Sequence, residues 1–242
     1  MKLKITLNEF EKNVSEDLMI YISHRGRMLE NAKNFESKNY DRDNKVECFM
    51  KMLKSKNCDG IEVDLQLSKD KKVVMYHDLY IEDEFIKDCS LERLKRKYNI
   101  ESFEELMDQL NDDMLMANTI ILDLKGVDDE LIINLMRILE NRDTSNMYLC
   151  SFNRKLSGKI PFKMNKGTTF EVMLREYEQD DFILSHNAVM IHWTCLSQDI
   201  IDKCKKKKVK VCCYTHKTKM ELDYIKSFDG VDVVISDVIS CL

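Results

Sequence analysis

Short apolar runs alternate with helical patterns along most of the chain. The runs that predict strands cover residues 18–23, 60–66, 73–77, 119–124, 147–151, 188–191, 209–214 and 231–236. Alternation of strands with helices is typical of βαβ units, in which a helix connects two parallel strands. The pattern therefore predicts an α/β fold built around a parallel sheet.

Helical patterns are clearest in three of the connecting segments. Apolar residues repeat at helical spacing in two of them: Val46, Phe49, Met50 and Leu53, and Leu131, Leu135, Ile138 and Leu139. A third helix is predicted to begin after Ser102, because Ser102 and Glu105 form the S-x-x-E pattern of a capping box. There is no internal repeat and no proline- or glycine-rich linker. Residues 1–242 are therefore interpreted as a single domain, of a length that suits an α/β barrel.

Composition and charge exclude several classes of protein. Hydrophobic residues make up 44% of the chain and charged residues 33%, an ordinary balance for a protein with a full core. The net charge of −5 argues against a nucleic-acid binder that works by neutralising phosphates. No early segment combines a basic start with a long apolar run, so we expect no secretion, no stable membrane insertion and a cytoplasmic location. None of the nine cysteines is spaced as C-x-x-C, which favours reduced, buried thiols over a disulfide framework or a zinc site.

One predicted strand carries charge where a buried strand should not. Glu62 and Asp64 lie two residues apart, so both carboxylates leave the strand on one face, while Val63 and Leu65 leave it on the other. Two neighbouring carboxylates repel each other, and burying either one unpaired is costly. We therefore expect a positive group between them.

Further charged residues stand at the ends of other predicted strands. His24 and Arg25 follow the first strand, His77 ends the third, and Asp123 and Lys125 end the fourth. Singly, each has an ordinary interpretation, such as an exposed histidine or a local ion pair. In a barrel of parallel strands, however, functional residues from several strands collect at the carboxyl-terminal rim. We expect these side chains and the two acids to converge there.

The order of these motifs resembles that of the glycerophosphodiester phosphodiesterase family. The similarity lies in H-R-G at residues 24–26, G-I-E-V-D-L-Q-L-S-K-D at 60–70, V-V-M-Y-H-D at 73–78, L-D-L-K at 122–125 and a closing S-D at 236–237, and it extends over about residues 20–237. The resemblance implies a TIM-type (β/α)8 barrel with its active site at the carboxyl-terminal rim. It also implies a metal-dependent phosphodiesterase that hydrolyses small glycerophosphodiesters to glycerol phosphate and an alcohol.

The resemblance assigns a role to each candidate residue. Glu62, Asp64 and Asp123 would bind a hard divalent cation, Mg²⁺ or Ca²⁺, which prefers oxygen ligands. Arg25 and Lys125 would bind the substrate phosphate. His24 and His77 would act as general base and general acid, in an order that the sequence leaves open. The remaining histidines, His186, His192 and His216, match no motif.

The chain departs from the family pattern in four places. The third metal ligand is commonly glutamate in the family and is Asp123 here, and W-T-x-N near the end of the family pattern is replaced by Tyr214-Thr215-His216-Lys217. The nearest match to P-E-N-T is Asp43-Asn44-Lys45. Residues 27–43 contain a polar insertion that is either a surface loop or a lid over the substrate.

Two other functions are compatible with the same motifs. One is a phospholipase-D-like or phosphoinositide-phospholipase-like enzyme acting on an intact lipid, which would need an exposed apolar rim that the polar insertion at 27–43 does not supply. The other is a barrel that binds a phosphorylated ligand without turnover. Loss of a histidine or an acid would favour that reading, and none is missing.

Overall fold

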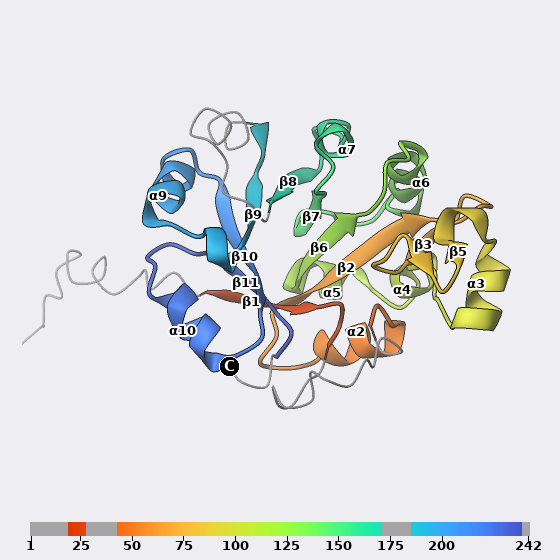
Figure 1. Ribbon diagram of the computed structural model, residues 1–242, viewed down its shortest axis with the longest axis horizontal. Coiled ribbons are helices and arrows are strands. Elements are labelled where there is room, and N and C mark those ends of the chain that lie inside the picture. The colour runs from red at the N-terminus through yellow and green to blue at the C-terminus, as the bar shows by residue number, and fades with distance from the viewer. Residues whose placement is uncertain (1–18, 28–42, 171–184, 239–242) are drawn as a thin grey trace, which may run out of the picture.

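Eight parallel strands form a closed barrel in the computed structural model, which describes residues 19–27, 43–170 and 185–238 (Figure 1). In barrel order the strands are β1 (Ile20–His24), β2 (Gly60–Leu67), β6 (Thr119–Leu124), β7 (Met147–Cys150), β8 (Asn165–Phe170), β9 (Ala188–His192), β10 (Lys210–His216) and β11 (Val233–Ser236). Strand β1 pairs in parallel with both β2 and β11, which closes the ring. The predicted single-domain (β/α)8 barrel is confirmed.

Helices surround the barrel and complete the βαβ units. They are α2 (Val46–Met52), α3 (Leu91–Tyr98), α4 (Phe103–Met107), α5 (Asp112–Ala117), α6 (Glu130–Ile138), α7 (Arg154–Gly158), α9 (Gln198–Lys206) and α10 (Lys219–Lys226), with short 3-10 turns at Ile86–Asp88 and Trp193–Cys195. Both predicted amphipathic helices are present, as α2 and α6. The capping box is also confirmed: at the start of α4, the Ser102 side chain accepts from the Glu105 backbone N–H, and the Glu105 side chain accepts from the Ser102 backbone N–H.

The prediction of a barrel strand at residues 73–77 is wrong. Strand β3 covers Val73–Met75 and runs antiparallel to β2, with Leu65 opposite Met75. The few residues between β2 and β3 can form a turn but cannot form the crossover that a parallel partner requires. A small hairpin, β4 (Tyr80–Ile81) and β5 (Glu84–Phe85), follows β3.

Strand β8, which completes the barrel between β7 and β9, was not predicted from the sequence. Its residues read N-K-G-T-T-F, so it has little of the apolar signal that marks the other strands. Gly167 lies where a Cβ would be 2.8 Å from the Met190 side chain on β9. Packing against the neighbouring strands therefore places this polar segment in the barrel, whereas its amino-acid composition does not predict a strand.

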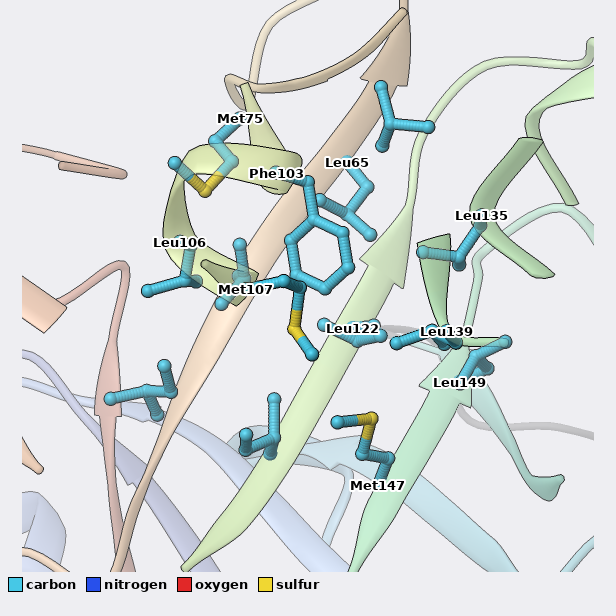
Figure 2. Close-up of a cluster of buried hydrophobic side chains, with 14 of the residues drawn as sticks. Leu65, Met75, Phe103, Leu106, Met107, Leu122, Leu135, Leu139, Met147 and Leu149 are labelled. Carbon is cyan, nitrogen blue, oxygen red and sulfur yellow. The ribbon is translucent and has the colours of Figure 1, made fainter. Parts of the chain in front are cut away.

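The main hydrophobic core lies between the barrel and its helices. Figure 2 shows Leu65, Leu122 and Leu149 from three adjacent strands facing Phe103 and other side chains of α4 and α6. A second cluster, which includes Ile22, Ile121, Met190 and Ile235, is formed by side chains of β1, β6, β9 and β11. Alternation along β2 thus places Val63 and Leu65 in the outer core and leaves the other face for Glu62 and Asp64.

The described cysteines are free thiols, and the described helices are short. The eight described cysteines are free, and all except Cys48 are buried. Among the described residues, no helix is both long and apolar enough to cross a membrane.

Candidate active site

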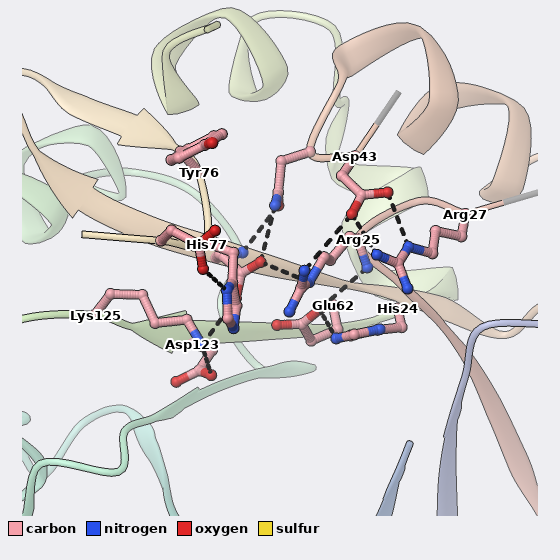
Figure 3. A network of polar contacts seen from close by, with 12 residues as sticks. His24, Arg25, Arg27, Asp43, Glu62, Tyr76, His77, Asp123 and Lys125 are labelled. Carbon is pink, nitrogen blue, oxygen red and sulfur yellow. Dashed lines mark hydrogen bonds and ion pairs between the residues drawn. The ribbon is translucent and has the colours of Figure 1, made fainter. Parts of the chain in front are cut away.

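A cavity of about 840 Å³ opens at the carboxyl ends of the barrel strands. Six of the seven predicted site residues line it, namely His24, Arg25, Glu62, His77, Asp123 and Lys125. The seventh, Asp64, is fully buried beside them. The structure therefore brings the predicted set together (Figure 3).

The three acids form one cluster. Asp64 on β2 lies directly opposite Asp123 on β6, and Glu62 is two residues before Asp64 on the same face. One oxygen from each carboxylate lies within 4.8 Å of the others. The buried Oδ1 of Asp123 has no hydrogen-bond partner in the described part of the chain. An all-oxygen donor set with an unsatisfied carboxylate oxygen fits a hard divalent cation.

The predicted positive groups also lie at these acids. Lys125 Nζ is 2.9 Å from Asp64 Oδ1 and 2.5 Å from Asp123 Oδ2, and Arg25 Nε is 3.1 Å from Asp64 Oδ2. Burial alone would raise the pKa of Asp64, but Lys125 and Arg25 outweigh it and lower that pKa. Burial, with repulsion from Asp64, raises the pKa of Glu62, and burial also raises the pKa of Asp123. Ionisation of all three carboxylates is therefore unfavourable even beside Lys125 and Arg25. This is expected of a site that can bind an additional cation.

The turn after β1 carries Arg25 into the site. Arg25 and Gly26 have positive φ values of 56° and 72°, and a Cβ on Gly26 would lie 2.9 Å from the Phe49 ring. The turn needs a glycine at residue 26 for both reasons. The backbone N–H of Arg25 then donates to Glu62 Oε2 at 3.1 Å.

Two site residues outside the predicted set contact its members. Asn44 donates from Nδ2 to Asp64 Oδ2 (2.8 Å) and accepts from the Asp64 backbone N–H through Oδ1 (3.0 Å), which fixes that carboxylate. Asp237, at the end of β11, lies 2.5 Å from His24 Nδ1 and also accepts from Arg27. Both stand in motifs that resemble the family pattern, and that resemblance was the only signal for them in the sequence.

His24 is held in one orientation by Asp237. Because an ionised carboxylate can only accept, the proton lies on Nδ1 and leaves Nε2, 3.9 Å from Glu62 Oε2, free to exchange a proton. Burial lowers the pKa of His24, against the opposing effect of Asp237. Burial would raise the pKa of Asp237, but His24 and Arg27 lower it to about 2.

His77 approaches the acids from a different part of the rim. It follows the antiparallel strand β3, and the Gln66 side chain anchors its turn by donating to the carbonyls of Tyr76 and Asp78 at 2.7 and 2.6 Å. Its Nδ1 lies 2.7 Å from Asp78 Oδ1, and its side chain is 39% exposed. In Figure 3, His24 and His77 lie on different sides of Glu62.

Sequence comparison identifies the family of the chain. The sequence model described as the "Glycerophosphoryl diester phosphodiesterase family" matches residues 24–240. The chain belongs to this family. It is accordingly a phosphoric diester hydrolase.

Relatives of this family member agree in sequence and fold. The chain is 26% identical to a glycerophosphodiester phosphodiesterase of Caldanaerobacter subterraneus, over 90% of this chain and 93% of that protein. A glycerophosphodiester phosphodiesterase structure from Thermotoga maritima is 21% identical, with a TM-score of 0.71, and the alignment covers 92% of this chain and 96% of that one. An Oleispira antarctica phosphodiesterase in complex with the product sn-glycerol-3-phosphate is 17% identical, with a TM-score of 0.72 and coverage of 92% and 94%.

The described residues of the departing motifs lie at or beside the same site. Tyr214 and Lys217 line the cavity, whereas His216 is buried and bonds to Ser236. Residues 28–42, which contain most of the polar insertion, lie outside the described residues, so the choice between loop and lid stays a prediction. Arg27 and Asp43 stand at the two ends of the insertion. The Arg27 guanidinium donates to both carboxylate oxygens of Asp43, at 2.8 and 2.6 Å.

Proposed function

We propose that this family member is a metal-dependent glycerophosphodiester phosphodiesterase that cleaves a small phosphodiester into glycerol phosphate and an alcohol. The observation that carries the proposal is the pair of histidines at a buried cluster of three carboxylates, with Arg25 and Lys125 beside it. A phosphodiester needs positive charge at its oxygens and two proton transfers, and this arrangement offers both. The product named for the Oleispira antarctica relative, sn-glycerol-3-phosphate, supports the same substrate class.

Glu62, Asp64 and Asp123 are the proposed ligands of a divalent cation, Mg²⁺ or Ca²⁺. When bound, the cation would supply Lewis-acid charge to a phosphoryl oxygen. The raised pKa of Glu62, the raised pKa of Asp123 and the unsatisfied Asp123 oxygen support this assignment. The three carboxylates lie on adjacent, hydrogen-bonded strands, so the donor set is held by the barrel itself.

Arg25 and Lys125 are proposed to bind the phosphate of the substrate. The Arg25 guanidinium can bind two phosphate oxygens as a fork, whereas Lys125 acts as a point charge. Burial would lower the pKa of Lys125, but Asp123 and Asp64 raise it, so the ammonium stays charged at all working pH values. Both side chains contact Asp64, which is one of the proposed metal ligands.

His24 and His77 are proposed to move the protons. One imidazole takes the proton of the attacking oxygen, and the other donates a proton to the departing alkoxide. Attack by water gives glycerol phosphate directly, whereas attack by a neighbouring hydroxyl of the substrate gives a cyclic phosphate, which a water molecule then opens to glycerol phosphate. Asp237 orients His24 so that Nε2 is available for this exchange. A barrel that only binds a phosphorylated ligand would not need two such histidines.

The test is a hydrolysis assay with a panel of glycerophosphodiesters. Activity should disappear in excess EDTA and return with Mg²⁺ or Ca²⁺. Asp123→Glu should retain more activity than Asp123→Ala, because the family commonly has glutamate at this position. Full activity in excess EDTA would overturn the metal assignment, and no turnover of any glycerophosphodiester would overturn the proposed function.

A further inference from the structure

One buried amide holds the backbone on both sides of His77. Gln66, on β2, is buried, and its Nε2 donates to the carbonyl oxygens of Tyr76 and Asp78 at 2.7 and 2.6 Å. Because a carbonyl oxygen can only accept, these two bonds use both N–H groups of the amide and fix the orientation of the Gln66 side chain. His77 lies between the two anchored peptide units.

These two carbonyls lie where the chain leaves the sheet. Just after β3, the Tyr76 N–H still donates to the Asp64 carbonyl on β2 at 3.2 Å, and the backbone then bends. Carbonyls beyond that point need donors from outside the strand ladder. The antiparallel register places Gln66 opposite Val74, two residues before Tyr76, so its side chain reaches the bend from the neighbouring strand. The bend that carries His77 is thus fixed to the strand that carries two of the three acids.

The imidazole of His77 is held less firmly by its side-chain contacts than that of His24. His24 is paired with the buried carboxylate of Asp237, whereas His77 is paired with Asp78, whose side chain is more than half exposed. An exposed pair fixes an orientation weakly, because water competes for both groups. The position of the His77 imidazole therefore depends mainly on the backbone that carries it.

Gln66 itself stands outside the substrate cavity. His77 lines that cavity and Gln66 does not. Its amide carries no charge, so it changes the electrostatics of the acids much less than Lys125 does. An effect of Gln66 on catalysis must pass through a neighbour, and the groups that it bonds are the peptide units beside His77. The other neighbour is Asp64, two residues before it on the same face of β2.

We propose that Gln66 is a positioning residue for proton transfer, whose two hydrogen bonds hold the His77 imidazole where it exchanges a proton with the substrate. This inference rests on the proposed function, in which His77 is one of the two groups that move protons. The proton passes between His77 and a substrate oxygen, whether His77 acts as base or as acid, and Gln66 neither gains nor loses one. Its contribution is geometric, and a displacement of about 1 Å can lower a rate about a hundredfold.

The test begins with Gln66→Met and Gln66→Asn, assayed on glycerophosphocholine. Methionine has a similar length and no donor, so both bonds are lost, whereas asparagine keeps the amide on a side chain one methylene shorter. Gln66→Met should reduce kcat about tenfold and Gln66→Asn less, both with little change in KM. Each loss should stay below that of His77→Ala, because a positioning residue cannot contribute more than the group it positions.

Combination with His77→Ala separates positioning from a general structural effect. If Gln66 acts through His77, Gln66→Met should change kcat less than about twofold in a chain that already lacks the imidazole. Losses from two residues that act independently would instead multiply. The metal concentration for half-maximal activity should stay unchanged in the Gln66 variants, because the contacts of Asp64 with Asn44 and Lys125 do not involve Gln66.

Gln198→Met is the matched control. Gln198 also holds a turn through its side chain, donating to the Asp229 carbonyl at 2.9 Å and accepting from the Asp229 N–H at 3.2 Å. It begins α9 and does not line the cavity, so its replacement should leave kcat and KM unchanged. Circular dichroism and Tm report whether each variant folds. If Gln66→Met does not fold, Gln66→Asn with and without His77→Ala gives the same comparison.

A loss of kcat in the Gln66 variants that disappears in the His77→Ala background supports the positioning role. Unchanged kcat in folded Gln66 variants, a loss that multiplies with that of His77→Ala, or a raised metal requirement overturns it, while hydrolysis by the unaltered enzyme upholds the proposed function. Normal kcat in His77→Ala overturns the proposed role of His77 and that of Gln66 together. No turnover of any glycerophosphodiester by the unaltered enzyme overturns the proposed function itself.

Discussion

Asp237→Asn is the most informative single substitution at the site. It keeps the size of the side chain and removes the charge that faces His24 Nδ1 at 2.5 Å. Asp237 is buried, and no other carboxylate among the described residues is paired with Nδ1 of His24. The change therefore removes the group that selects the tautomer and orientation of His24, without creating a cavity.

The expected loss follows from the strength of this contact. A hydrogen bond to a charged group contributes about 1.5–3 kcal/mol net, and about 1.4 kcal/mol corresponds to a tenfold change in rate. If His24 transfers a proton in the rate-limiting step, turnover should fall about 10- to 100-fold. Substrate binding should weaken much less, because Asp237 does not belong to the proposed phosphate or metal ligands.

The pH profile separates positioning of His24 from a general structural defect. Asp237 raises the pKa of His24, so its loss should lower that pKa further. The limb of the kcat/KM profile that reports His24 should then move to lower pH, whether His24 is the base or the acid. A purely structural defect would reduce the amount of active enzyme and leave the limb in place.

Asp78→Asn is the matched control. Its carboxylate lies 2.7 Å from His77 Nδ1 in the same kind of pair, but the Asp78 side chain is 54% exposed. Exposed ion pairs contribute about 0–1 kcal/mol, so the loss should stay below about fivefold. The reasoning would be refuted if Asp237→Asn kept turnover within about threefold of the wild type with an unmoved pH limb, or if both variants lost activity equally.

Two further predictions concern the chemistry and the barrel. His24→Ala and His77→Ala should each reduce turnover by about a hundredfold or more, the usual scale for a general acid or base, with a much smaller change in KM; near-normal kcat in either variant would return that histidine to a structural role. Gly60→Ala should prevent stable folding, because its Cβ would lie 1.8 Å from the Thr119 carbonyl oxygen, whereas Gly158→Ala, with open space around it, should keep or slightly raise Tm. Equal thermal stability of the two alanine variants would contradict that packing argument.

Much of this protein could be predicted from local patterns in the sequence. Side-chain direction alternates along a strand, so the order of Glu62, Val63, Asp64 and Leu65 alone places two acids on one face and two apolar residues on the other. Helix spacing and the capping box at Ser102 are equally local, and the structure confirms them. The convergence of the seven predicted site residues followed from one further rule, that strand ends in a parallel barrel share a rim.

The tertiary structure decided whatever depends on pairing between distant segments. The direction of β3 is set by its short turn from β2, and β8 is a strand because its neighbours pair with it, although its own residues are polar. Asp237 lies 2.5 Å from His24 Nδ1 although 213 residues separate the two in the chain, and Leu79, Val127 and Phe152 line one cavity although they follow three different strands. A periodic pattern reports which face of an element is buried, but it carries no information about which element covers that face. Which elements pack against each other is determined only in the folded barrel.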